Sequence, residues 1–161
     1  MKKRKQIIVT AAAGILLALL YAVIFNFSAQ DGEQSGNLSL MLSEKCAELL
    51  GSLSGKHWSS AVLEGWAEYF QHPLRKLAHF SEYACMGVLV CILWKQWLHS
   101  RKKLCLLTVA WVFVSAAGDE FHQLFVPGRY GCFGDVLLDT CGGIFGMLLC
   151  LFICRKPGRL D

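Results

Sequence analysis

Ionisable side chains lie within long apolar stretches of this 161-residue sequence, where a charge is costly. Their spacing is helical: residues three or four positions apart share one face of a helix, as His79 and Glu82 do, and Asp119 and His122. Two histidines and two carboxylates from neighbouring helices could bind a divalent metal, and His122 could alternatively be a general base oriented by Asp119. The candidate catalytic or metal-binding residues are therefore His79, Glu82, Asp119 and His122. No established metal motif supports a cofactor.

A second group of polar residues surrounds these positions and could recognise a ligand. Its basic members can engage phosphate or carboxylate groups. Glu120 is rotated away from His122 along the predicted helix, so we expect it to meet another helix, where Arg75, Lys76 or Arg129 could pair with it. The candidate binding residues are Arg75, Lys76, Glu120, Gln123, Arg129, Asp135 and Asp139.

The elements that position these residues are predicted to be membrane-spanning helices. The sequence is 55% hydrophobic, and its apolar residues gather in four runs. Each run is close to the roughly 20 residues that cross a hydrocarbon core of about 30 Å. We predict an all-α membrane bundle, a single domain over residues 1–161, with spans at about 7–27, 77–98, 104–126 and 133–154. At about 1.5 Å per residue, Glu82, Asp119 and Asp139 reach a similar depth, so they could share one site.

The distribution of basic residues predicts the orientation of these spans. Lysine and arginine cluster before the first span, between the second and third, and after the fourth, whereas acidic residues outnumber basic ones in segment 28–72. Basic flanks resist translocation, so both termini are expected in the cytoplasm and segment 28–72 outside, with the first span retained as an anchor. The net charge of +4 then reflects topology and predicts no nucleic-acid binding.

The outer segment is too apolar to be a disordered linker. Apolar residues recur at helical spacing from Leu38 to position 50 and again from Trp58 to position 70, with a glycine- and serine-rich break at 51–55. We expect two amphipathic helices, the second ending at Pro73, because proline disfavours helix in the residue before it. They would lie in the outer membrane interface or cover the bundle.

Three smaller features concern packing. Gly142 and Gly146 have the GxxxG spacing that permits close helix contact. The sequence VPGR at 126–129 favours a type II turn. Six of the eight cysteines fall in predicted spans; Cys46 and Cys132 lie on the outer side, but their spacing is too weak to predict a disulfide between them.

Several of these motifs together resemble the VanZ-like family. They are FSAQ at 27–30, RKLAHFSEY at 75–83, DEFHQLFVPGR at 119–129, and Asp135, Asp139, Gly142 and Gly143 in the last span. The resemblance covers all four spans and leaves residues 36–72 unassigned. It implies a multi-pass protein of the bacterial cytoplasmic membrane with a role at the cell envelope, where the family's namesake is linked to resistance to the glycopeptide teicoplanin.

Three functions remain open on the sequence alone. The first is binding of an envelope component, such as a lipid-linked cell-wall precursor or a lipoglycopeptide, at an outer-leaflet polar site. The second is a membrane enzyme, metal-dependent or based on a His/Asp pair, that hydrolyses a lipid headgroup. The third is a proton or ion transporter, for which the chain would have to oligomerise. We favour noncatalytic binding, with the lipid bilayer as the general partner.

Overall fold

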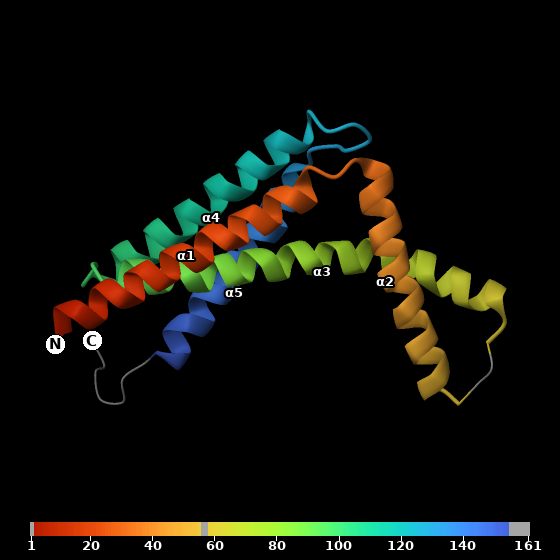
Figure 1. Cartoon of the computed structure of the whole chain (residues 1–161), viewed down its shortest axis with the longest axis horizontal. Coiled ribbons are helices and arrows are strands. Elements are labelled where there is room, and N and C mark those ends of the chain that lie inside the picture. Colours follow the sequence, from red (N-terminus) through yellow and green to blue (C-terminus); the bar gives the residue numbers. More distant parts are fainter. Residues whose placement is uncertain (1, 56–57, 155–161) are drawn as a thin grey trace.

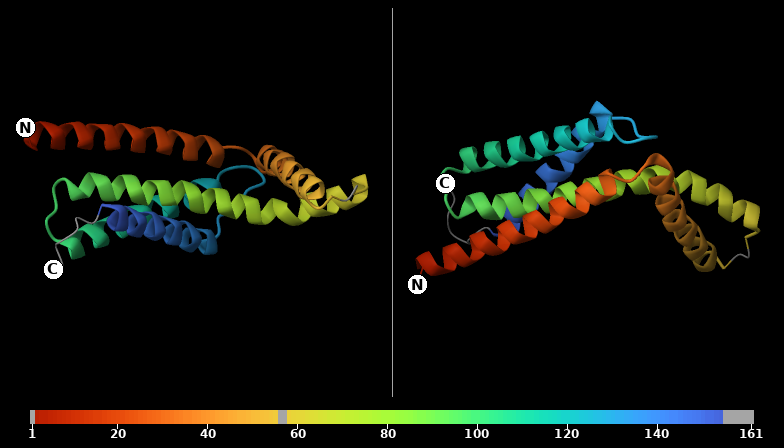
Figure 2. Two further views of the ribbon diagram at one scale, coloured as in Figure 1. Left: turned by 90° about the horizontal axis from the view of Figure 1, so that it is seen from below. Right: turned by 45° about the horizontal axis from the view of Figure 1, so that its top comes forward.

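The computed structural model describes residues 2–55 and 58–154, which form five helices (Figure 1). They are α1 (Lys2–Ser28), α2 (Gly32–Leu53), α3 (Ser60–Lys95), α4 (Arg101–Gln123) and α5 (Phe133–Ile153). The prediction of an all-α fold is confirmed. The start of α1 and the end of α5 lie at the same end of the bundle (Figure 2).

Four of the helices, α1, α3, α4 and α5, are long and apolar enough to cross a membrane. Large apolar side chains such as Leu106, 69% exposed, and Phe152, 75% exposed, point away from the protein. Such exposure suits a helix whose surroundings are lipid, because lipid tails are as apolar as the side chains themselves. The four predicted spans are therefore confirmed as helices, although α4 ends at Gln123 rather than near residue 126.

The prediction that a helix ends at Pro73 is wrong, because α3 is 36 residues long and continues through this proline. A helix of that length is about 54 Å long, well beyond the hydrocarbon core of about 30 Å. Its N-terminal part projects past the ends of α1 and α4 (Figures 1 and 2). Contacts with α2 hold this part: Gln71 donates to the Gly36 carbonyl over 2.9 Å. Tertiary packing therefore overrides the local preference of proline.

Helix α2 runs crosswise to α3 and packs on it through small residues (Figure 1). The buried positions of α2 are Ser39, Ser43, Ala47 and Gly51, spaced four apart, which lets the two backbones approach closely. The leucines of the face that the sequence singled out are largely exposed instead, with Leu49 59% exposed. α2 is thus amphipathic as predicted, but its apolar face is not what attaches it to α3.

Glycines set the contact between α3 and α5, the most extensive in the bundle. A side chain added at Gly142 would strike the backbone of Phe80, and one added at Gly146 would strike that of Ala84. Close approach of the two helices therefore requires glycine at both positions, which confirms the prediction from their spacing. Beside this contact lies the main core, which includes Tyr83, Met86, Val90, Val112 and Ala116.

The segment between α4 and α5 contains the predicted tight turn. Gly128 has φ of +71°, and the Arg129 amide donates to the Val126 carbonyl over 3.1 Å. A positive φ at the third position and this hydrogen bond define a type II turn, so the prediction is confirmed. The turn also docks on the start of α2, since the Gly32 amide donates to the Pro127 carbonyl over 3.0 Å.

Candidate functional site

An apolar cavity of about 390 Å³ lies where the end of α1, the first half of α2 and the middle of α3 meet. Four leucines and a phenylalanine supply much of the apolar surface of its wall, and α2 contributes Leu38 and Leu42. Polar groups, including Glu82 and Ser81 of α3, occupy the remainder of the wall. The cavity is therefore amphipathic, with space for the apolar part of a ligand beside a few polar contacts.

A smaller polar cavity of about 150 Å³ lies beside the first one, along the same part of α3. Its wall comes from α3, the end of α4, the turn after α4 and the start of α5. The polar residues around it are His72, Arg75, Lys76, His79, Glu120, Gln123, Arg129 and Asp135. Of the seven candidate binding residues, six line this cavity.

The two cavities meet at three residues, because Arg75, His79 and Arg129 line both. Arg75 and His79 are one helical turn apart on α3, so they share one face. Arg75 makes no hydrogen bond or ion pair with any residue that the structure describes. Its guanidinium is thus available to a ligand that spans the two cavities. We call these three residues the cavity junction.

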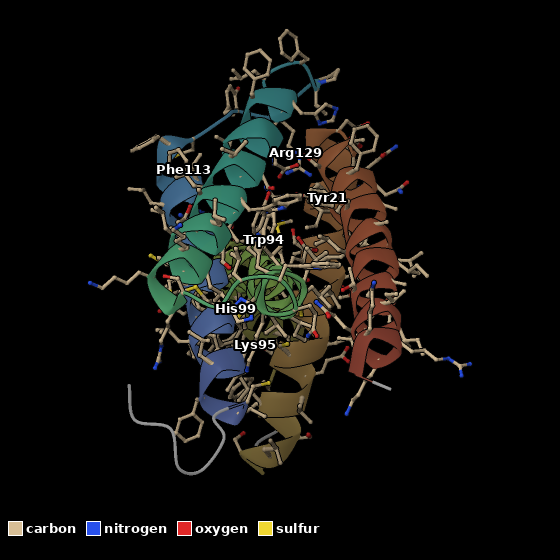
Figure 3. All side chains as sticks on the ribbon, turned by 90° about the vertical axis from the view of Figure 1, so that its left-hand side faces the viewer. Tyr21, Trp94, Lys95, His99, Phe113 and Arg129 are labelled. Carbon is tan, nitrogen blue, oxygen red and sulfur yellow. The ribbon has the colours of Figure 1, made fainter. Side chains whose placement is uncertain are left out.

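Arg129 (Figure 3), by contrast, donates hydrogen bonds to other residues of the protein. Its guanidinium donates to the Phe27 carbonyl over 2.8 Å and to the Gln30 carbonyl over 3.1 Å. These acceptors lie at the end of α1, where carbonyls lack helical partners. Burial lowers the pKa of Arg129, but an arginine side chain stays charged in proteins. Arg129 therefore joins the turn after α4 to the end of α1.

Glu120 is buried and accepts a hydrogen bond from the Cys132 amide over 2.7 Å. The expected ion pair with Arg75, Lys76 or Arg129 does not form within the described part of the chain. A backbone amide just before α5 takes its place, because the end of α4 and the start of α5 are joined by a short segment that folds back onto Glu120. Glu120 therefore helps to position α5.

Two carboxylates of α5 face α3. Asp135 pairs with Lys76 over 3.1 Å, and both side chains are partly exposed. One turn further, Asp139 lies 3.9 Å from Nδ1 of His79, measured to Oδ2. Asp139 is 0% exposed, and neither its carboxylate oxygens nor Nδ1 of His79 has a hydrogen-bond partner among the described residues.

The four candidate catalytic residues do not all line one cavity. His79 and Glu82 line the apolar cavity, but Asp119 and His122 line neither cavity. Asp119 accepts a hydrogen bond from Gln123 over 3.2 Å, whereas His122 faces α1, with Nδ1 3.5 Å from the Ser28 hydroxyl. The pairing that the structure creates instead is His79 with Asp139.

The structure also bears on the metal-binding alternative. Within residues 2–55 and 58–154, no three histidine, cysteine, aspartate or glutamate side chains are placed to hold a metal ion. Helical spacing placed His79 and Glu82 on one face, but a shared site needs the helices to converge, and His122 turns toward α1. Cys46 and Cys132 are both free thiols. Among the described residues, the site instead gathers basic side chains beside a buried carboxylate without a hydrogen-bond partner.

Two contributions to the site were not assigned from the sequence, which left open whether the outer helices cover the bundle. One is the wall that α2 provides, for which the helical spacing of its leucines was the available signal, although it does not show which neighbour they face. The other is the FSAQ stretch at 27–30, whose backbone carbonyls receive Arg129. Because these acceptors are backbone carbonyls, the residue types in the sequence do not identify them.

Four apolar spanning helices with polar residues gathered between two cavities define a multi-pass membrane protein. Residues 13–154 match the model of the VanZ/LLP1 family, so the chain belongs to the VanZ/LLP1 family. The resemblance seen in the motifs is thereby confirmed. Searches of curated proteins and of solved structures gave no match.

Proposed function

We propose that this protein binds an amphiphilic component of the bacterial cell envelope at the extracytoplasmic face of the membrane. The acidic headgroup of the ligand contacts Arg75 and occupies the polar cavity, and its apolar part occupies the cavity that α2 helps to form. Lipid-linked cell-wall precursors and lipoglycopeptides both combine an acidic group with a long apolar chain. The proposed action is binding without chemical turnover.

The observation that carries this proposal is the guanidinium of Arg75, which has no partner among the described residues and lies between an apolar and a polar cavity. A charged group at the end of a membrane span is costly unless it is hydrated or meets a partner. Arginine forms strong, charge-assisted hydrogen bonds with phosphate and carboxylate groups. An amphiphile is the ligand class that supplies an anion for Arg75 and an apolar chain for the neighbouring leucines.

The proposed orientation places this site at the outer leaflet. Basic residues lie at the ends of the spans that are away from the cavities: residues 2–5 begin α1, and residues 101–103 begin α4. These ends are expected in the cytoplasm. Both cavities lie at the opposite ends of the helices, so a ligand would reach them from the outer leaflet, where wall precursors and glycopeptides meet.

The physiological role we propose follows from family membership and this site. A protein that binds a lipid-linked precursor or a lipoglycopeptide would reduce the binding of the drug to its target. We expect a susceptible bacterial host that produces this chain to tolerate more teicoplanin than the host alone.

The test compares the unaltered chain with Arg75→Gln and with Arg101→Gln as a matched control. Arg101 is exposed at the start of α4, away from both cavities, so its loss removes one positive charge without touching the site. At equal membrane abundance, Arg75→Gln should abolish protection and Arg101→Gln should retain it. Protection that survives Arg75→Gln, or its absence with the unaltered chain, would contradict this proposal.

A further inference from the structure

We propose that His79 and Asp139 form a proton-binding pair through which the site takes a phosphate headgroup together with one proton. This inference rests on the proposed binding function and names its ligand class. The proton comes from solvent and adds to the imidazole of His79, which then donates a hydrogen bond to a phosphate oxygen. No covalent bond of the ligand forms or breaks.

The register of α3 against α5 is what places the two side chains opposite each other. Gly142 contacts the backbone of Phe80 so closely that no side chain fits between them. Phe80 follows His79 directly, and Asp139 lies one helical turn before Gly142, so the glycine contact fixes their separation. The measured distance from Nδ1 of His79 to Oδ2 of Asp139 is 3.9 Å.

Among the described residues, Asp139 has no hydrogen-bond donor that would stabilise a negative charge. It is completely buried, and both of its oxygens lack a hydrogen-bond partner within the described residues. A buried carboxylate is tolerated when it is neutral or when a cation lies beside it. Protonation of His79 supplies that cation, so the protonated imidazole and the carboxylate balance each other's charge.

His79 can offer this proton to a ligand because of the way its ring is placed. Nδ1 is buried and faces Asp139, whereas the residue as a whole lines both cavities, so the ring presents its opposite edge to them. Arg75 lies one turn away on the same face of α3. Together they present two donors to one anion at the cavity junction.

A phosphate group suits these two donors better than a single carboxylate does. Several phosphate oxygens can accept hydrogen bonds from different sides, while an ester oxygen continues toward the apolar cavity. An anion at this point favours the protonated form of His79, because unlike charges attract at short range. Binding should therefore draw in one proton and weaken as the pH rises.

Other charged groups also face His79, and the test must separate their contribution. From α3 these are Arg75 and Glu82, from α4 Asp119, from the turn Arg129, and from α5 Asp135 and Asp139. His72 lines the polar cavity as well and could titrate in the same range. Substitution of His79 itself is therefore the decisive change.

The experiment measures the affinity of the purified full-length chain for phosphatidylglycerol in nanodiscs, with phosphatidylcholine as the uncharged reference. A phosphodiester keeps its charge across the range used, about pH 5.5 to 8.5, so any pH dependence belongs to the protein. Binding with uptake of one proton raises Kd up to about tenfold per pH unit. The unaltered chain and the His99→Gln control, exposed and distant from both cavities, should show this slope.

His79→Gln keeps a hydrogen-bonding side chain but cannot take up a proton, so its Kd should be independent of pH. Asp139→Asn should also flatten the slope, because the neutral amide no longer stabilises protonated His79. An unchanged slope in His79→Gln would overturn this inference and leave the proposed function standing. Absence of phosphatidylglycerol binding at every pH in the folded, unaltered chain, judged by its helical circular dichroism, would overturn both.

Discussion

The guanidinium of Arg129 donates a hydrogen bond to the backbone carbonyl of Phe27 over 2.8 Å, which ties the turn between α4 and α5 to the end of α1. Its Nε reaches the Gln30 carbonyl as well, over 3.1 Å. These hydrogen bonds hold Arg129 in place at the cavity junction. Arg75 is then the arginine of the junction that has no partner among the described residues. The two arginines that the sequence presents as equivalent binding candidates therefore have different surroundings.

Replacement of Arg129 by glutamine should lower stability more than replacement of Arg75 does. Hydrogen bonds from a charged donor are worth about 1.5 to 3 kcal/mol each, and Arg129→Gln disrupts two of them. Arg129→Lys should not restore the loss, because an ammonium group lacks the planar fork that reaches both carbonyls. Thermal unfolding in detergent measures the difference; an Arg75→Gln protein less stable than Arg129→Gln would contradict it.

Alanine at Gly142 or Gly146 should separate α3 from α5. The added methyl group would overlap with a backbone carbonyl, of Phe80 or Ala84 respectively, and backbone cannot move aside as a flexible side chain does. Overpacking of this kind costs about 1 to 3 kcal/mol. Equilibrium unfolding in mixed micelles should show this loss for both variants.

The matched control for these glycines is Gly118→Ala. Gly118 also lies within a span, but nothing is within 4 Å of a side chain added there. Alanine is the better helix former by about 1 kcal/mol, so this variant should be as stable as the unaltered chain or more stable. Equal losses at positions 118 and 142 would mean that the glycines act through helix propensity and not through contact.

Removal of the charge at Asp139 should stabilise the protein while it impairs binding. A buried carboxylate without hydrogen-bond partners is a cost to the fold, and an apolar group of similar size removes that cost. Asp139→Leu should therefore unfold at a higher temperature than the unaltered chain and bind phosphatidylglycerol more weakly. If Asp139→Leu were instead destabilised by several kcal/mol, the carboxylate would have a structural role.

The sequence was sufficient to predict the four membrane-spanning helices of this protein, because the length of an apolar run is a local property. The spans near 7–27 and 133–154 agree with α1 and α5 to within a few residues, apart from the basic start of α1. The type II turn and the glycine contact were equally predictable, since each depends on residue types at fixed spacing. Pro73 was misread because contacts with α2 decide its conformation.

The candidate site was predictable in its members but not in their pairing. Helical spacing shows which residues of one helix share a face, as with Arg75 and His79. It does not show how far each helix is rotated toward its neighbours. His122 was therefore grouped with His79, although the structure turns it toward the ring of Phe25, with centroids 4.9 Å apart. Only the α3 to α5 register reveals that Asp139 faces His79.

Replacement of Pro73 by alanine should stabilise α3 and make the helix stiffer where its projecting N-terminal part meets its membrane-spanning part. Proline within a helix removes one backbone hydrogen bond and costs about 3 kcal/mol, part of which is recovered because proline also restricts the unfolded chain. The variant should show a net gain of about 1 to 2 kcal/mol in detergent unfolding. A loss of stability would mean that a bend at Pro73 is needed to seat α2.

The proposed orientation can be tested independently of any ligand. Basic residues flank the ends of the helices opposite the cavities, and a reversed protein would have to translocate these clusters. A fluorescent protein fused after Asp161 should therefore fold and fluoresce in the cytoplasm, and alkaline phosphatase fused after Gly55 should be active outside. The reverse pattern would place both cavities at the inner leaflet. Wall precursors and glycopeptides at the outer surface could not then reach Arg75, so the proposed role in teicoplanin tolerance would fail even if lipid binding persisted.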